Sequence, residues 1–320
     1  MKISEEIKEH VSFLFNKAQK VAVIGHKNPD GDALGSILGL TEIFTQRGKI
    51  CIPITYDQGA NNLKFLPNYE KIIHKLVMDD YDLIIVCDSA TKNMTGFEKH
   101  EKLFTSIHGI PIINIDHHHV SNEIYGTINI VNNFASTTVI ITDLLLNIGW
   151  EINCKAATCF LTGIYTDTGS FMHSNTDPFT LKMASKLLLK GANLRLIRKN
   201  IFKTTQISTL RLWGRVLSNI DKNDQGVTVS VVTDNDFKET GAHYSDLTGI
   251  IDYVNSVPNS NFSIILTERE GQVKGSLRTL KDDVDLSEIA SFFGGGGHKK
   301  AAGFTVPGKL EKEVRWNIVE

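Results

Sequence analysis

Short apolar runs, mostly β-branched, recur along the first half of the chain, and stretches with helical spacing separate them. The runs predict buried strands at Val21–Gly25, Ile50–Thr55, Leu83–Asp88 and Ile110–Ile115. Helices are expected over residues 3–19, Ala33–Phe44, Ala135–Ile148 and Pro178–Leu189, with further helical stretches between and after the strands and a looser connection at residues 58–80. Periodicity does not settle the type of Cys154–Tyr165, for which we favour a helix. This β/α alternation predicts an α/β fold with a doubly wound, mainly parallel sheet.

The predicted secondary structure changes from mainly helical to richer in strands after residue 220. Leu194–Ile220 is strongly helical and rich in Arg and Lys, as expected of a connector, and the chain beyond it is richer in strands, at Val227–Thr233, Phe262–Glu268 and Gln272–Arg278. A chain of 320 residues also exceeds the usual size of a single core. We therefore predict an N-terminal domain at 1–192, a helical connector at 193–222 and a smaller C-terminal α/β domain at 223–320.

Composition narrows the ligand classes. Hydrophobic content of 41% and charged content of 22% are ordinary for a soluble protein, and a net charge of −2 gives no general polyanion-binding surface. A nucleic-acid ligand should therefore be short and locally held, not a long duplex. The four cysteines form no CxxC pair, and no apolar run approaches membrane length. We expect reduced thiols, a cytoplasmic location and no membrane contact.

Residue types that bind metals follow the apolar segments. Taken alone, Asp-Gly-Asp is mostly a turn or a helix cap, a lone Asp in a Thr/Gly loop is mostly a turn former, and adjacent histidines are often merely solvated. Four segments with the same design favour a shared metal centre at the carboxyl edge of the sheet. The candidate residues are His26, Asp30 and Asp32 after the first strand, Asp88 after the third, Asp116, His117, His118 and His119 at the fourth, and Asp167 after Cys154–Tyr165.

A run of four glycines, Gly294–Gly297, precedes His298 near the C-terminus. Such a run costs backbone entropy on folding, so it needs a reason. One alternative is a flexible linker. The other, which we favour, is a phosphate-binding loop that precedes a helix N-terminus, with Ser276 and Arg278 at a nearby strand end as further contacts. A lone Arg at a strand end is more often a surface charge.

Together, the Asp30/Asp32 loop, Asp88, Asp116-His117-His118 and Asp167 resemble the DHH phosphoesterases, and the glycine-rich His298 segment resembles their DHHA1 companion domain. The resemblance spans essentially the whole chain. It is strongest to the stand-alone two-domain subfamily, which includes bifunctional oligoribonucleases that also dephosphorylate 3′-phosphoadenosine 5′-phosphate (pAp), and relatives that cleave dinucleotides.

The resemblance implies a pair of divalent cations. One would be held by His26, Asp30 and Asp88, and the other by Asp32, Asp88, His117 and Asp167, with Asp88 between them. Carboxylates with imidazoles and no thiolate suit Mn²⁺, with Mg²⁺ and Co²⁺ as alternatives. Asp116 would orient an imidazole, and His118 would contact the scissile phosphate or assist the leaving group. His119 is additional to the three-residue motif and is assigned no role.

In the same scheme the C-terminal domain selects the substrate. Its contacts to the terminal nucleotide would be Ser276, Arg278, Gly295, Gly296, Gly297 and His298. The expected activity is hydrolysis of short RNA to nucleoside 5′-monophosphates, together with removal of the 3′-phosphate of pAp. A phosphodiesterase for pApA or cyclic di-AMP has the same motifs. A manganese pyrophosphatase and a catalytically inactive nucleotide-binding regulator are further alternatives, and a homodimer is left open.

Overall fold

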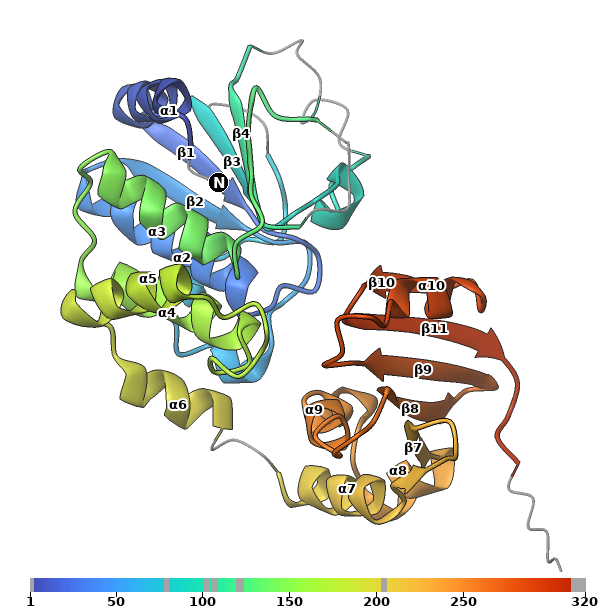
Figure 1. The fold of residues 1–320 in the computed structure, drawn as a ribbon. Coiled ribbons are helices and arrows are strands. Elements are labelled where there is room, and N and C mark those ends of the chain that lie inside the picture. The colour runs from blue at the N-terminus through green and yellow to red at the C-terminus, as the bar shows by residue number, and fades with distance from the viewer. Residues whose placement is uncertain are drawn as a thin grey trace, which may run out of the picture. The chain divides into compact units, whose positions relative to one another are not determined.

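A computed structural model describes residues 3–77, 81–99, 104, 109–118, 124–202 and 206–311. The chain divides into two compact units, Met1–Thr204 and Thr205–Glu320 (Figure 1). The division falls inside the segment expected to connect two domains, between α6 (Leu194–Phe202) and α7 (Ile207–Ser218). Ile197 of α6 is buried in the core of the first unit, whereas Leu212 and Val216 of α7 are buried in the core of the second. Each of these two helices therefore belongs to a folded unit.

The first unit is built on a five-stranded sheet in which all paired strands are parallel (Figure 1). Its spatial order is β2-β1-β3-β4-β5, so the strand order reverses at β1. The strands are β1 (Lys20–Ile24), β2 (Ile50–Ile54), β3 (Leu83–Cys87), β4 (Ile112–Asp116) and β5 (Ile128–Val131). The predicted α/β fold with a mainly parallel sheet is confirmed. Ligands of open α/β sheets bind beyond the carboxyl ends of the strands, at such a reversal.

The two faces of this sheet are covered differently. Val21 and Val23 lie in the core beneath the long helices, and Ala22 and Ile24 lie in a smaller core on the other face. The helices are α1 (Glu5–Lys17), α2 (Gly31–Gln46), α3 (Thr137–Asn147), α4 (Cys154–Asp167) and α5 (Pro178–Leu189). Cys154–Tyr165 is therefore helical, as favoured. The connection between β2 and β3, expected to be loose, contains the 3₁₀ turns η1 (Asn61–Leu63) and η2 (Tyr69–Lys71), and the described residues between β3 and β4, where a helical stretch was expected, form only the 3₁₀ turn η3 (Lys92–Thr95).

Helices α2 and α4 approach closely because glycines recur on the α2 face that meets α4. A Cβ at Gly35 would lie 2.6 Å from the Cys159 carbonyl oxygen, and a Cβ at Gly39 would overlap the Phe160 ring. Gly31, one turn earlier, has Thr166 as its neighbour in the same way. Spacing of four residues places all three glycines on one helix face. This close packing brings the start of α2 next to the end of α4.

The second unit contains a mixed six-stranded sheet of order β10-β11-β9-β8-β7-β6, in which β7 and β8 pair in parallel and the other pairs are antiparallel. Its strands are β6 (Asp221–Lys222), β7 (Val227–Val232), β8 (Phe262–Arg269), β9 (Gln272–Arg278), β10 (Gly296–His298) and β11 (Ala301–Pro307). Helices α7, α8 (Asp234–Thr240) and α9 (Ile250–Val254), with the turn η5 (Tyr244–Leu247), share one core. Helix α10 (Leu286–Ser291) shares another with β9 and β11.

The glycine run does not form the predicted loop before a helix. Gly296–His298 is strand β10, which pairs with β11 in an antiparallel hairpin. A Cβ on Gly297 would lie 2.5 Å from the Ala301 carbonyl oxygen and 2.6 Å from Ala302 Cα, so the run allows two backbones to approach closely. Gly297 also has φ +143°, which favours glycine.

In the part of the chain that the structure describes, no helix combines the length and the apolar character that crossing a membrane requires.

Candidate metal centre

Seven side chains from both halves of the first unit converge at the carboxyl edge of its sheet. They form three groups in which one nitrogen or carboxylate oxygen per residue lies within 4.8 Å of the others. The groups are His26, Asp30 and Asp88; Asp32, His117 and Asp167; and Asp88, His117 and His118. Every metal ligand expected from the sequence is in this cluster. His119 lies outside the described residues.

The first group lies where β1 leads into α2. His26 Nε2 is 3.4 Å from an Asp88 carboxylate oxygen and 3.7 Å from Asp30 Oδ1. His26 Nδ1 is 2.7 Å from the Lys27 carbonyl oxygen, which can only accept, so Nδ1 carries the proton. Asp30 also caps α2, because its Oδ1 accepts from the backbone N–H groups of Asp32 and Ala33. The cap interpretation and the ligand interpretation of Asp30 are therefore compatible.

In the second group, the imidazole of His117 is oriented in the same way as that of His26. His117 Nε2 is 3.5 Å from Asp88 Oδ1 and 3.5 Å from Asp167 Oδ2. Its Nδ1 is 3.2 Å from the Phe134 carbonyl oxygen. A backbone carbonyl that accepts from one ring nitrogen fixes the tautomer and aims the other nitrogen, as is usual for a metal-binding histidine.

The first turn of α3 holds two of the carboxylates. Asp32 accepts three hydrogen bonds there, from the Thr137 N–H at 2.6 Å, the Thr138 N–H at 3.0 Å and the Thr138 hydroxyl at 2.6 Å. The Thr137 hydroxyl donates to Asp88 Oδ1 at 3.1 Å. These four side chains are buried. The sequence analysis missed both threonines; the available signal was a Ser-Thr-Thr helix start, which is also an ordinary cap.

Crowding of carboxylates raises the pKa values of some of them. Burial and then the Asp88 charge raise the pKa of Asp32 to about 7. Burial and then the Asp32 charge raise the pKa of Asp167 well above its ordinary value. The pKa of His26 is raised as well. Burial alone would lower it, but Asp30 and Asp88 raise it to about 11 and so favour the charged ring. The cluster therefore carries an excess of negative charge that a cation would relieve.

The backbone at Asp88 is strained. Its φ is +58°, a left-handed value that is uncommon for a residue with a Cβ. The Asp88 N–H donates to the Ile115 carbonyl oxygen at 2.9 Å, which ties the residue to β4. Such strain is typical of functional positions that the surrounding structure holds in place.

Asp116 and His118 form a pair beside the cluster. His118 Nδ1 donates to Asp116 Oδ1 at 2.9 Å and is 3.5 Å from Asp88 Oδ1. Burial alone would lower the pKa of His118, but the hydrogen bond to Asp116 raises it above its ordinary value. Asp116 Oδ2 is buried and has no hydrogen-bond partner among the described residues.

Comparison with known proteins matches both halves of the chain. The model of the DHH family N-terminal domain matches residues 20–164, and the DHHA1 domain model matches residues 224–316. Over 298 residues the chain is 34% identical to the bifunctional oligoribonuclease and PAP phosphatase NrnA of Thermus thermophilus, covering 90% of this chain and 84% of that protein. The chain belongs to the DHH family. It is a metal-dependent DHH phosphoesterase.

Two further similar proteins match nearly the whole chain. The NrnA protein of Bacillus subtilis is 25% identical over 285 residues, which cover 88% of this chain and 87% of that one. The crystal structure of an exopolyphosphatase-related protein from Bacteroides fragilis is 27% identical, with a TM-score of 0.85 over 98% of this chain and 93% of the other. The similarity therefore spans both units.

The donor set of the DHH domain fits divalent cations. The three groups consist of carboxylates and imidazoles and contain no thiolate, and this combination suits ions such as Mn²⁺. Two of its three histidines, His26 and His117, direct Nε2 at carboxylates while Nδ1 lies against a backbone carbonyl oxygen. Burial and then the charge of Asp88 raise the pKa of Asp32, and a bound cation would offset the repulsion between these carboxylates.

In the DHHA1 domain, most of the expected substrate contacts share one face of the sheet. Arg278 on β9 and His298 on β10 both pair with Ala301, and Ser276 and Gly296 both pair with Gly303. Residues paired across neighbouring strands lie on the same face. The positions that alternate with them on β9, Val273 and Leu277, are buried.

The remaining two expected contacts lie differently. Gly297 pairs with the buried Ala302 and therefore belongs to the opposite face, and Gly295 precedes β10 with its Cα against β11. Arg278 Nη1 donates to the Leu277 carbonyl oxygen at 2.9 Å. Burial lowers the pKa of the Arg278 guanidinium, against the attraction of Asp252.

Proposed function

We propose that the cluster holds two Mn²⁺ ions and that the protein hydrolyses short RNA to nucleoside 5′-monophosphates and removes the 3′-phosphate of pAp. One ion would be bound by His26, Asp30 and Asp88, and the other by Asp32, Asp88, His117 and Asp167. The observation that carries the proposal is the convergence of these ligand types from four separate chain segments, with Asp88 in two of the three groups. The substrates are those of the NrnA relatives, which are bifunctional oligoribonucleases and PAP phosphatases.

When bound, two such cations supply counter-charge for phosphoryl oxygens and acidify a water molecule. The protein's own residues position them. Asp88 contributes carboxylate oxygens to both groups, since its two oxygens lie 3.4 Å from His26 Nε2 and 3.5 Å from His117 Nε2. Thr137 and Thr138 keep Asp88 and Asp32 in orientation through buried hydrogen bonds.

His118 is proposed to act on the phosphate. Because its Nδ1 proton is directed at Asp116, a proton passed to the departing O3′ oxygen would come from Nε2. The hydrogen bond to Asp116 raises the pKa of His118 above its ordinary value, which favours the protonated ring that such a transfer needs. Asp116 would fix the tautomer and stabilise the charged ring, without touching the substrate.

The DHHA1 domain is proposed to hold the 5′-phosphate and sugar of the substrate. Arg278 offers a planar guanidinium suited to phosphate oxygens, beside His298 and Ser276. The small residues between them, Ala301 and Gly303, leave room for a ligand to lie against the strand. Gly295, Gly296 and Gly297 would contribute backbone groups. A site of this size, in a protein of net charge −2, suits mono- and oligonucleotides and not long duplexes.

The test is hydrolysis of a substrate panel in Mn²⁺, followed by chromatography of the products. The panel contains pAp, RNA dimers to pentamers, pApA, cyclic di-AMP and pyrophosphate. We expect cleavage of pAp and of the RNA oligomers. Selective cleavage of cyclic di-AMP or of pyrophosphate would refute the substrate assignment and identify a different DHH activity.

The variant Asp88→Asn tests the role of the shared carboxylate. We expect it to lose Mn²⁺-dependent hydrolysis of every substrate by at least about 100-fold, because both ion sites lose a charged ligand. Asp143→Asn, on the same unit but outside the cluster, is the matched control and should retain activity. Hydrolysis by Asp88→Asn within a few-fold of the wild type would show that Asp88 does not join the two sites.

A further inference from the structure

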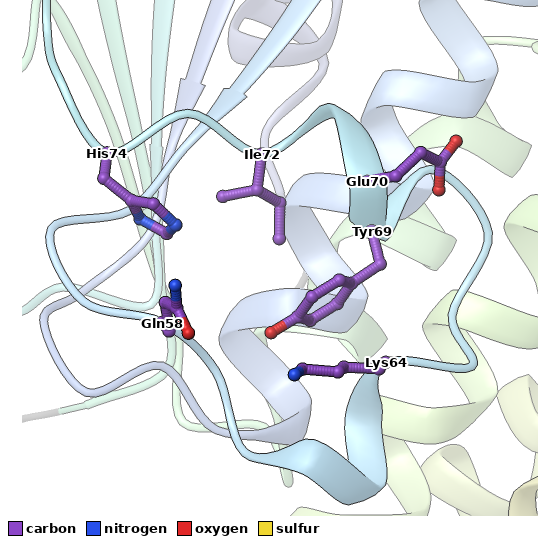
Figure 2. A pocket seen from close by; sticks show the side chains of 6 residues that line it. All are labelled: Gln58, Lys64, Tyr69, Glu70, Ile72 and His74. Carbon is purple, nitrogen blue, oxygen red and sulfur yellow. The ribbon is translucent and has the colours of Figure 1, made fainter.

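A cavity opens in the first unit, and none of the expected metal ligands lines it. Its volume is about 220 Å³, and its lining comes from the connection between β2 and β3 (Figure 2). The lining residues are Gln58, Lys64, Tyr69, Glu70, Ile72 and His74. None of the roles argued above uses any of them.

The connection places this cavity at the carboxyl edge of the sheet. Ile73 donates its N–H to the Pro53 carbonyl oxygen at 3.0 Å, and Thr55 donates its N–H to the Ile73 carbonyl oxygen at 3.2 Å. The bridge is parallel, so this segment runs beside β2 in the same direction. His74, the next residue, therefore emerges at the same edge as the metal ligands, and its Nδ1 lies 3.0 Å from the Thr55 carbonyl oxygen.

Thr55 also links the cavity to the metal ligands. A Cβ on Gly25 would lie 3.6 Å from Thr55 Cγ2, and Gly25 directly precedes His26. The loop after Thr55 makes a second contact, because Asp57 Oδ2 accepts from the Asn28 N–H at 3.0 Å. The segment with Ile72 and His74 thus lies two strand spacings outward from β1, which leads into His26, and two such spacings are roughly 10 Å.

The walls of the cavity suit a flat heterocycle. Tyr69 offers an aromatic ring and Ile72 an apolar side chain, while Gln58 and His74 offer hydrogen-bonding groups (Figure 2). An amide presents both donors and an acceptor, as base edges require. The Lys64 amine lies near the hydroxyl end of Tyr69 in the same view. Glu70 points away from Gln58 and His74, so its charge is not directed into the centre.

The bond that the proposed reaction breaks indicates which base of the substrate the cavity would bind. Hydrolysis to 5′-monophosphates adds a water oxygen to phosphorus and breaks the bond from phosphorus to O3′, and the departing O3′ takes a proton. The nucleoside that loses the phosphate is present in both pAp and RNA. The downstream nucleoside, which keeps the phosphate on its 5′ oxygen, is present only in the oligonucleotide.

We propose that the cavity lined by Gln58, Tyr69 and His74 binds the base of the downstream nucleotide and so adapts the phosphatase site to oligonucleotides. This inference rests on the proposed function. A base stacked on an aromatic side chain contributes binding free energy with little sequence preference, which suits an enzyme that acts on short RNA of any sequence. Loss of the cavity's contacts should therefore weaken dinucleotide cleavage and spare pAp.

The experiment compares kcat/KM for pApA and for pAp with the full-length Mn²⁺-loaded protein. Gln58→Ala and His74→Ala change exposed side chains, so both variants should fold, and thermal melting checks this. We expect each to lower kcat/KM for pApA by roughly fivefold or more while pAp changes by less than about twofold. Lys71→Ala, exposed on the same connection but not lining the cavity, is the matched control.

A dimer whose downstream base is replaced by hydrogen provides a second measurement. The wild type should cleave it more slowly than pApA, and the cavity variants should no longer distinguish the two. Equal loss of pAp and pApA cleavage in the variants, or no loss in either, would overturn the inference. If the wild type cleaves neither pAp nor pApA, the proposed function itself is wrong, so the two failures are distinguishable.

Discussion

Thr138 offers the sharpest test of how the protein prepares its metal site. Thr138→Val removes the hydroxyl that donates to Asp32 Oδ1 at 2.6 Å and leaves the backbone N–H groups of Thr137 and Thr138 in place. A hydrogen bond to a charged group contributes about 1.5–3 kcal/mol. Since each 1.4 kcal/mol is a factor of about ten, we expect Mn²⁺ affinity at one of the two sites to fall roughly 10- to 100-fold.

The assay is titration of Mn²⁺ into chelator-treated protein by calorimetry, which needs no turnover. Thr142→Val is the matched control, because Thr142 is buried one turn later on the same helix and its hydroxyl donates at 2.7 Å to the Thr138 carbonyl oxygen. The control should change Mn²⁺ affinity by less than about threefold. Wild-type affinity in Thr138→Val, or an equal loss in Thr142→Val, would refute the idea that the hydroxyl orients Asp32.

Three other outcomes follow from the same geometry. Without metal, the raised pKa of Asp32, about 7, means that the folded state binds a proton more tightly than the unfolded state, so stability should fall as the pH rises from about 4 to 7, and Mn²⁺ should restore it at pH 8 in thermal melts. Maleimide at pH 8 should label Cys154, which is exposed, when the native protein is analysed by mass spectrometry. The three buried thiols, Cys51, Cys87 and Cys159, should stay unmodified, because burial raises their pKa values. Gly163→Ala would bring a Cβ to 2.6 Å from Asp32 Oδ1 and 2.5 Å from Thr138 Cγ2, so it should weaken Mn²⁺ binding, whereas Gly214→Ala, in open space on α7, should not; equal Mn²⁺ affinities in the two variants would contradict this.

The first unit was largely predictable because its chemistry follows its strands. Buried parallel strands are continuous apolar runs, and the residues after them must come together at one edge of the sheet. That rule alone predicts that His26, Asp88 and His117 lie close together. In the structure Asp88 shares one group with His26 and another with His117, and the candidate ligand atoms of each group lie within 4.8 Å of one another. The helices α2, α3, α4 and α5 were predicted for a similar reason, since each has a capping residue and a long apolar stretch.

Other features could not be read from local pattern. The helical stretch expected after β3 is the 3₁₀ turn η3 in the described residues, and Phe97, which follows it, packs in the core on the second sheet face. The glycine run became β10 because the pairing partner, β11, supplies the order that the residues lack by themselves. Such tertiary pairing overrides local propensity.

The metal cluster also depends on helix packing that strand patterns do not encode. Asp32 is carried by α2, is held by the first turn of α3 and has Gly163 of α4 as its neighbour. A side chain at Gly163 or Gly35 would separate these helices, and Asp32 would lose its place between Thr138 and the other carboxylates. The strands therefore determine where the ligand residues emerge, and three closely packed helices determine which way the buried carboxylate points. A sequence with every expected ligand intact would therefore lose the orientation of Asp32 through one added methyl group.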